Sequence, residues 1–120
     1  MPGYKTLLAY QKAKQVADEI FVISKTFPTE EKYSLTDQIR RSSRSVCSCL
    51  SEAYRKRKYP AHFVSKLTDS DMENGETEVW LDFAKDCNYL SKEKHQQLYA
   101  LNEEVAKLLS FMINHPEKFL

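Results

Sequence analysis

Apolar residues recur at intervals of three and four in four stretches of the chain, which is the spacing of one face of an α-helix. The first stretch spans about residues 5–26, and Pro28 ends it because proline cannot continue a helix. The second begins at Ser34-Leu35-Thr36-Asp37, where the Ser34 hydroxyl can accept a backbone N–H and Asp37 can reach back as in a capping box. We expect this helix to run to about Lys56.

The third stretch follows Tyr59-Pro60 and continues to Cys87, and Asn88-Tyr89-Leu90 predicts a short turn. Ser91 is placed to cap a fourth helix, which His115-Pro116 ends. The apolar positions of this last helix step alternately by three and four: Leu98, Leu101, Val105, Leu108 and Met112.

Four helices joined by short loops predict an all-α fold, an antiparallel up-and-down four-helix bundle. A length of 120 residues suits one core, so we expect a single domain over 1–120. Only two Gly and four Pro occur, and 42% of the residues are hydrophobic, which favours a folded, helix-rich chain over a disordered one.

The sequence shows neither a membrane-spanning segment nor a signal peptide. No apolar run approaches the ~18 residues of a membrane span, and the amino terminus lacks the pattern of a signal peptide. We therefore expect a cytoplasmic protein with no membrane partner.

Three cysteines make an odd count, and Cys47 and Cys49 point to different sides of a helix. Reduced structural thiols are favoured over a disulfide or a metal site.

The second helix carries a strong charge asymmetry. The whole chain has a net charge of +1, yet the segment from Arg40 to Lys58 holds seven basic residues and one acid, Glu52, for a local charge of +6. At about 100° per residue, its apolar positions fall on one side and most of the cations opposite. Arg57 falls on the apolar side, which predicts that the helix ends near Lys56. The basic residues are Arg40, Arg41, Arg44, Arg55, Lys56, Arg57 and Lys58.

The third helix has the opposite charge. Between Asp69 and Asp86 it carries seven acids against one base, Lys85, a local charge of −6. Two interpretations follow for the basic residues. Arg40, Arg41 and Arg44 can pair with these carboxylates, within the chain or across a subunit boundary. The flanking run from Arg55 to Lys58 is the stronger candidate for binding nucleic acid.

The third helix is also apolar on two sides. One stripe contains Phe63, Leu67 and Leu81, and the other contains Met72, Val79, Trp80, Phe83 and Cys87. A helix of a monomeric bundle needs one stripe, so Met72, Val79, Trp80 and Phe83 predict a subunit interface, with a wide single core as the alternative. Gly75 lies in mid-helix, and the close approach of a neighbouring helix would explain it.

No catalytic or metal-binding pattern accompanies these features. A di-iron bundle needs Glu-x-x-His, and no Glu is followed three residues later by His. His62, His95 and His115 lie near helix ends and suit ordinary surface or boundary positions. Gly3 and Gly75 make no phosphate-binding loop. The sequence predicts a binding protein with no catalytic residues, metal, cofactor or small-molecule substrate.

Several segments resemble a known family in their order and spacing. They are Tyr4-Lys5, Tyr10-Gln11-Lys12-Ala13, Phe27-Pro28, Glu31-Lys32-Tyr33-Ser34-Leu35-Thr36, Gln38-Ile39-Arg40-Arg41-Ser42, Ser45-Val46 with Ser48, Glu52 and Tyr54, Glu76-Thr77-Glu78, and Asn88-Tyr89-Leu90. The chain is similar to the bacterial four-helix-bundle proteins first noticed as reading frames in intervening sequences of large-subunit ribosomal RNA genes. It departs from their pattern at Cys47, Cys49 and Ala53, and its third helix is more acidic.

The resemblance implies a non-enzymatic bundle that assembles as a ring-like homopentamer. The fold is also similar to that of the accessory variability protein of diversity-generating retroelements, which engages a reverse transcriptase and nucleic acid. Arg40 and Arg41 match the family's paired basic positions, and Arg55 matches a basic residue after its Glu-Gly segment. Structured RNA or a ribonucleoprotein is therefore the expected partner. The alternative is a homo-oligomeric protein-interaction scaffold without a nucleic-acid role.

Overall fold

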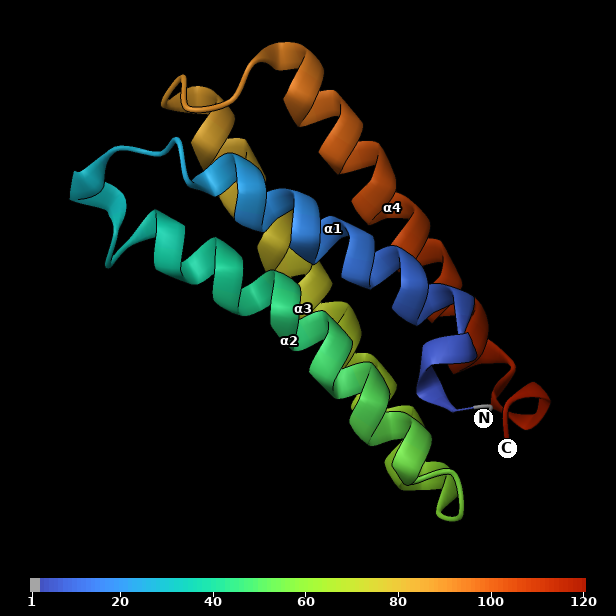
Figure 1. The fold of residues 1–120 in the computed structure, drawn as a ribbon. Coiled ribbons are helices and arrows are strands. Elements are labelled where there is room, and N and C mark those ends of the chain that lie inside the picture. The colour runs from blue at the N-terminus through green and yellow to red at the C-terminus, as the bar shows by residue number, and fades with distance from the viewer. Residues whose placement is uncertain (1–2) are drawn as a thin grey trace.

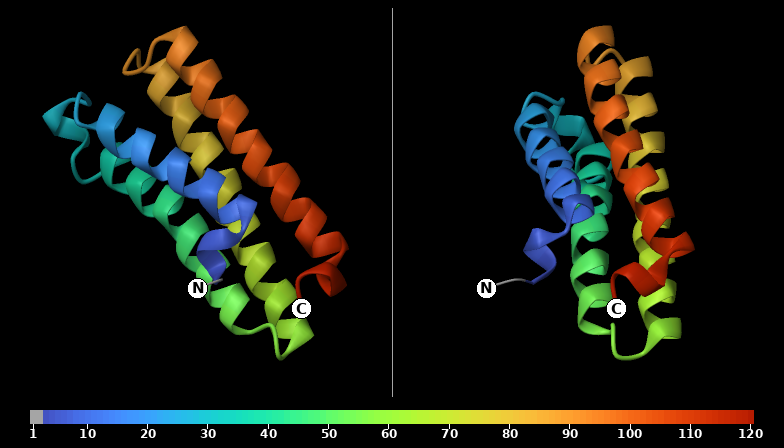
Figure 2. Two further views of the ribbon diagram at one scale, coloured as in Figure 1. Left: turned by 45° about the vertical axis from the view of Figure 1, so that its right-hand side comes forward. Right: turned by 90° about the vertical axis from the view of Figure 1, so that its right-hand side faces the viewer.

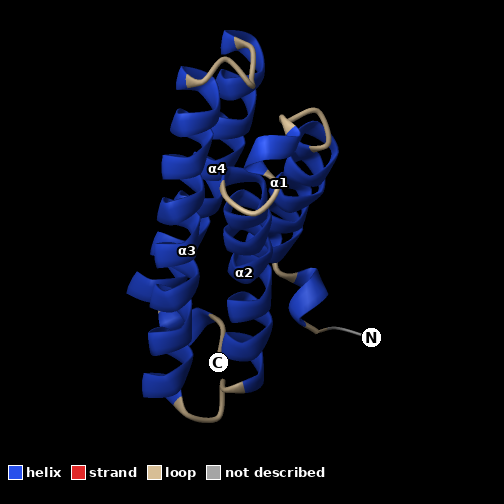
Figure 3. Ribbon diagram, turned by 90° about the vertical axis from the view of Figure 1, so that its left-hand side faces the viewer, coloured by secondary structure: helices blue, strands red, loops and turns tan. Residues whose placement is uncertain are grey.

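A computed structural model describes residues 3–120, and the described part is helical without any strand (Figure 3). The four main helices are α1 (Leu8–Ser24), α2 (Leu35–Arg55), α3 (Pro60–Asp86) and α4 (Lys92–Asn114). Three short 3-10 turns flank them: η1 (Tyr4–Thr6), η2 (Thr29–Glu31) and η3 (Pro116–Lys118). The predicted all-α class and four-helix count are confirmed. Among the described residues, no helix is both long and apolar enough to cross a membrane.

Successive helices run antiparallel and pack as two layers, α1 with α2 and α3 with α4 (Figures 1 and 2). α1 contacts α2 and α4, and α3 contacts the same two helices, so each helix has two neighbours. The bundle measures 44 × 25 × 25 Å. The α2–α3 loop lies at the same end of the bundle as both termini (Figure 1).

The inward faces are those that the periodicity predicted. Leu35, Ile39, Val46, Leu50 and Ala53 of α2 are all buried. In α4 the buried face is turned slightly from the predicted one, because Leu109 is fully buried while Leu101 and Leu108 are only partly buried.

Small polar side chains fill the contact between α2 and α3. The hydroxyl of Ser70 donates to the carbonyl of Val46 at 2.8 Å, and that of Thr77 donates to the Ser42 hydroxyl at 2.9 Å. Short side chains let these two helices approach closely, and their hydrogen bonds satisfy buried hydroxyls. Gly75 plays no part here: it is exposed, and a Cβ added to it would meet no atom of the described chain within 4 Å. Within this chain, the close-approach interpretation of Gly75 is wrong.

The predicted helix starts have different outcomes. The Ser91 side chain caps α4 by accepting the N–H of Lys94 at 3.0 Å, as predicted. Ser34 stands at the N-cap of α2, but its side chain makes no capping bond. Instead Glu31 Oε1 accepts the Leu35 N–H at 3.2 Å, because the turn η2 brings that carboxylate over the helix start. The second oxygen of Glu31 accepts the Tyr89 hydroxyl at 3.0 Å, and this bond raises the pKa of Tyr89 to about 12.

The position of His95 also differs from the expected one. This residue was expected at a surface or boundary position, but it is buried between α3 and α4, and its Nε2 lies 2.8 Å from Asp82 Oδ1. A polar ring at this depth keeps a partner because an unpaired buried polar group would be costly. His95 therefore helps to hold α4 against α3.

Candidate nucleic-acid interface

Two of the mid-helix arginines of α2 lie against an aromatic ring of α1. The guanidinium carbons of Arg40 and Arg44 are 4.8 and 5.1 Å from the centroid of Phe21, and Lys25 Nζ is 4.7 Å from it. Arg40 Nε also donates to the Ser24 hydroxyl at 2.7 Å. A ring face attracts cations through its quadrupole without cancelling their charge. The edge of α2 next to α1 therefore carries a cluster of positive charges gathered on one ring.

Arg41 has the opposite environment. Its Nη1 is 2.7 Å from Glu73 Oε2, and its Nη2 bonds Glu76, so both carboxylates come from α3. The hydrogen bond to Glu73 raises the pKa of Arg41, which means that the pair stabilises the charged guanidinium. Pairing with the acidic third helix was expected for three arginines, and within residues 3–120 the structure shows it for Arg41 alone.

The basic cluster spans the last residue of α2 and the short loop that follows it. α2 ends at Arg55 and Lys56 is its C-cap, as the position of Arg57 on the helical wheel predicted. The Arg57 guanidinium stacks 3.6 Å from the Tyr54 ring centroid and its Nε donates to the Tyr54 carbonyl at 2.9 Å. Arg55, Lys56 and Lys58 are exposed. Cations at this end also interact favourably with the negative end of the helix dipole.

Few carboxylates neutralise this surface. Within residues 3–120, no carboxylate oxygen lies within 4.0 Å of six of the seven basic residues. Glu52, the one acid of the segment, is held by Lys66 of α3 at 3.0 Å. The six residues without a carboxylate partner are Arg40, Arg44, Arg55, Lys56, Arg57 and Lys58.

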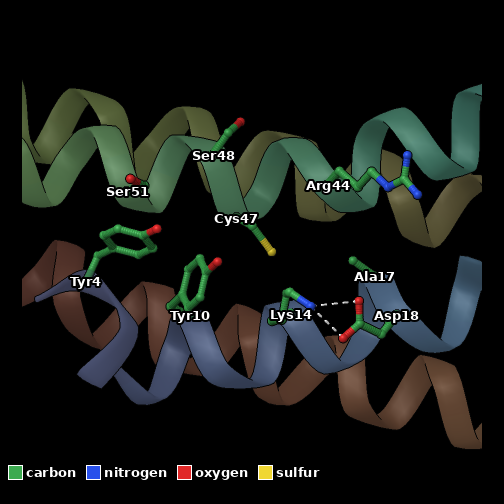
Figure 4. Close-up of a pocket in the computed structure, with 9 residues that line it drawn as sticks. All are labelled: Tyr4, Tyr10, Lys14, Ala17, Asp18, Arg44, Cys47, Ser48 and Ser51. Atoms are coloured by element: carbon green, nitrogen blue, oxygen red, sulfur yellow. Dashed lines mark hydrogen bonds and ion pairs between the residues drawn. The ribbon is translucent and has the colours of Figure 1, made fainter.

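A hollow separates the first part of α1 from the middle of α2 (Figure 4). It has a volume of about 520 Å³. The rings of Tyr4 and Tyr10 and the sulfur of Cys47 project into the gap between the helices (Figure 4). Arg44 extends along α2 away from the two tyrosines. Burial raises the pKa of the Cys47 thiol to about 11, so the thiol is neutral at pH 7. The lining residues are Tyr4, Tyr10, Lys14, Ala17, Asp18, Arg44, Cys47, Ser48 and Ser51.

The second apolar stripe of α3 is exposed on the outside of the bundle. Met72 is 74% exposed, Val79 48% and Phe83 53%, while Trp80 is partly buried against the core. Trp80 and Phe83 also border a smaller cavity of about 230 Å³ beside the start of α2. The wide-core alternative does not account for this stripe, because four of its five residues are exposed: Met72, Val79, Phe83 and Cys87.

Sequence reasoning missed Phe21 and the hollow. Phe21 lies beside the predicted core stripe of the first helix, and a large aromatic residue outside that stripe was the available signal. The hollow has no local signal, because it depends on which small residues face one another across two helices. No group of three or more His, Cys, Asp or Glu within the described chain is placed to hold a metal ion.

An all-α bundle with a basic surface on one helix and an apolar stripe on another is thus established. A family model described as 23S rRNA-intervening sequence protein matches residues 5–111, and the chain belongs to this family. The family resemblance expected from the sequence is confirmed.

A solved structure supports the same assignment. It is a protein of unknown function from the S23 ribosomal protein family of Bacteroides thetaiotaomicron, 28% identical, with a TM-score of 0.81 over 89% of this chain and 96% of that one. A comparison with curated proteins gave no match. Both family names refer to ribosomal RNA or the ribosome, and neither describes an enzyme.

Proposed function

We propose that this protein is a non-enzymatic, oligomeric helical bundle that binds structured RNA or a ribonucleoprotein in the cytoplasm. The basic residues of α2 and of the loop after it form the binding surface. The observation that carries the proposal is that six of the seven cations between Arg40 and Lys58 have no carboxylate partner within the described chain. The name of the family, 23S rRNA-intervening sequence protein, agrees with such a partner.

The charges of this surface suit a phosphate backbone. Arg55, Lys56 and Lys58 are exposed at one end of α2, and Arg44 extends the positive edge along the helix. Phosphates attract such cations over a Debye length of about 10 Å at 0.1 M salt, and binding releases counterions. Arg41 belongs to the same segment, but it contributes less because Glu73 and Glu76 already occupy its guanidinium.

The test is RNA binding by the triple variant Arg55→Ala/Lys56→Ala/Lys58→Ala, measured with a labelled RNA hairpin over a range of salt concentrations. The wild-type log–log salt slope should become shallower by about 2–3, since each phosphate contact contributes ~0.7–0.9. Lys92→Ala/Lys107→Ala/Lys118→Ala is the matched control, because it removes three exposed cations from α4 and η3 instead. Equal effects of the two variants, or no RNA binding by the wild type, would refute the proposal.

The exposed stripe of α3 favours a second candidate function. Here the protein is a homo-oligomeric interaction scaffold without a nucleic-acid role, and Met72, Val79, Trp80 and Phe83 form the subunit interface. Monomers rarely expose contiguous apolar surface of this kind, and Trp is enriched where subunits meet. Five copies, the number implied by the family resemblance, would bury five such stripes in a ring.

Molar mass measured by light scattering tests this assembly. Wild type should have a mass near five times 14.0 kDa, and Val79→Lys should reduce it toward one copy. Val22→Lys is the matched control, because Val22 is 63% exposed on α1 and lies outside the stripe. A monomeric wild type, or an unchanged mass of Val79→Lys, would exclude this interface. If Arg40→Ala dissociates the oligomer, the scaffold function is favoured, with charged side chains holding the subunits together.

A further inference from the structure

We propose that the hollow between α1 and α2 binds an unpaired base of an RNA strand whose backbone follows α2 from Arg44 toward Arg55. This inference rests on the proposed RNA-binding function and deepens it, since it names the form of RNA that the surface prefers.

The shape and lining of the hollow suit a flat aromatic ligand. Its volume of about 520 Å³ lies within the ~300–1,000 Å³ typical of small-molecule sites. The rings of Tyr4 and Tyr10 meet edge to face, with centroids 4.8 Å apart and planes at 78°. In this arrangement one ring can offer its face to a base while the other supports it from the side. Stacking on aromatic side chains is the usual way in which proteins hold unpaired bases.

Polar groups lie where the rest of a nucleotide would reach. Ser51 of α2 borders the hollow, and its hydroxyl can both donate to and accept from base edges. The Ser48 hydroxyl already donates to the Ser45 carbonyl at 3.2 Å, so it can only accept. The Cys47 thiol next to them is neutral, so it adds no negative charge to the site. The hollow therefore combines an aromatic wall with adaptable hydrogen-bonding groups.

The charge around the hollow favours an anionic strand. Lys14 holds Asp18 with Nζ–O distances of 2.7 and 2.9 Å, so the carboxylate is neutralised by its own neighbour. Arg44 has no carboxylate within 4.0 Å in the described chain and remains available to a phosphate. Arg55 lies one turn beyond Ser51. At 1.5 Å per residue, Arg44 and Arg55 are about 16 Å apart along α2, which is a span of a few nucleotides.

An RNA duplex cannot use such a site. Bases in an A-form helix are paired and stacked, and only loops, bulges and ends can turn a base outward. A hollow that takes one base therefore makes the surface prefer unpaired RNA. The basic loop after α2 contacts phosphates only, so it binds both forms of RNA.

The experiment compares a labelled twelve-nucleotide oligouridine with a twelve-base-pair RNA duplex, using wild type and the variant Ser51→Phe. The new ring fills the hollow without changing any charge. We expect wild type to bind the single strand more tightly, and Ser51→Phe to weaken single-strand binding by about tenfold or more while leaving duplex binding unchanged. Tyr10→Leu should act in the same direction, since it keeps apolar bulk but removes a stacking face. Circular dichroism melting checks that both variants fold.

The results separate this inference from the function on which it rests. If Ser51→Phe and Tyr10→Leu leave single-strand affinity unchanged, or weaken both RNA forms equally, the base-binding hollow is refuted while RNA binding stands. If wild type binds neither RNA, both proposals fail. Uridine monophosphate in excess should not displace the strand. If it does, the hollow is a site for a free nucleotide, and its assignment to an RNA strand is overturned.

Discussion

Arginine side chains lie on both edges of α2, but their surroundings on the two edges differ. On the edge next to α3, Arg41 lies between two carboxylates, and the helices meet through buried hydroxyls. On the edge next to α1, Arg40 and Arg44 lie over Phe21 and have no carboxylate partner in the described part of the chain, and a hollow opens between the helices. The availability of an arginine to an external anion thus depends on the helix that it faces more than on its own segment.

The largest expected difference between the edges is in packing. Ser42→Phe, at a fully buried position against α3, should lower the free energy of unfolding by about 3 kcal/mol, because the close-packed contact has no room for a ring. Ser51→Phe, which borders the hollow, should change it by less than about 0.5 kcal/mol. Urea denaturation followed by circular dichroism measures both. Similar losses would mean that the two edges are equally packed.

The two arginines should differ in what they support. Arg41→Ala should cost about 0.5–1 kcal/mol of stability, since it leaves Glu73 and Glu76 without a partner on a partly exposed surface. Its RNA affinity should stay within about twofold of wild type. Arg44→Ala should lower RNA affinity by about three- to tenfold with little change in stability. Fluorescence anisotropy and urea denaturation give the two quantities, and a reversed pattern would contradict the difference between the edges.

Removal of the ring of Phe21 tests what holds the positive edge together. Phe21→Leu keeps an apolar side chain but removes the face shared by Lys25, Arg40 and Arg44. We expect a loss of about 0.5–1 kcal/mol in the free energy of unfolding, the usual size of cation–π contacts at exposed sites. Phe21→Tyr is the control, because it retains a ring face and should stay close to wild type. Equal losses in both variants would show that the ring face contributes nothing.

The smallest expected effect concerns pH on the α1 edge. Burial raises the pKa of the Cys47 thiol from 9.0 to about 11, so the folded state binds this proton more tightly than the unfolded state. Its contribution to stability is therefore complete below pH 9 and is lost as the pH rises toward 11. Wild type should lose more stability across this range than Cys47→Ala, as measured by urea denaturation at each pH. Parallel curves would mean that water in the hollow solvates the thiolate.

The helices, their inward faces and the end of α2 follow from the sequence because they depend on local periodicity and capping. The position of Arg57 on the helical wheel was enough to predict where α2 stops. Contacts between helices could not be derived in this way. Arg40 and Arg41 are sequence neighbours, but 100° of helical rotation turns one toward Phe21 and the other toward Glu73.

The capping box predicted at the start of α2 did not form, also because of a contact from outside the helix. Ser34 and Asp37 have the local pattern of a capping box, but the 3-10 turn η2 directs the backbone carbonyl of Glu31 to the Ser34 N–H and its carboxylate to the Leu35 N–H. The hollow could not be predicted from the pattern of a single helix either. Ala17 of α1 and Ser48 of α2 give no signal in the sequence, and only the register of the two helices brings them to the same hollow.

The location of the α2–α3 loop, at the same end of the bundle as both termini, gives each molecule a direction (Figure 1). Rotation about an axis parallel to the helices keeps that direction, so every copy in a cyclic assembly would present its basic loop on one rim. Contacts that are weak singly then act together through a high effective concentration. The opposite rim carries none of these loops, and a second macromolecule could dock there without competing for the nucleic acid.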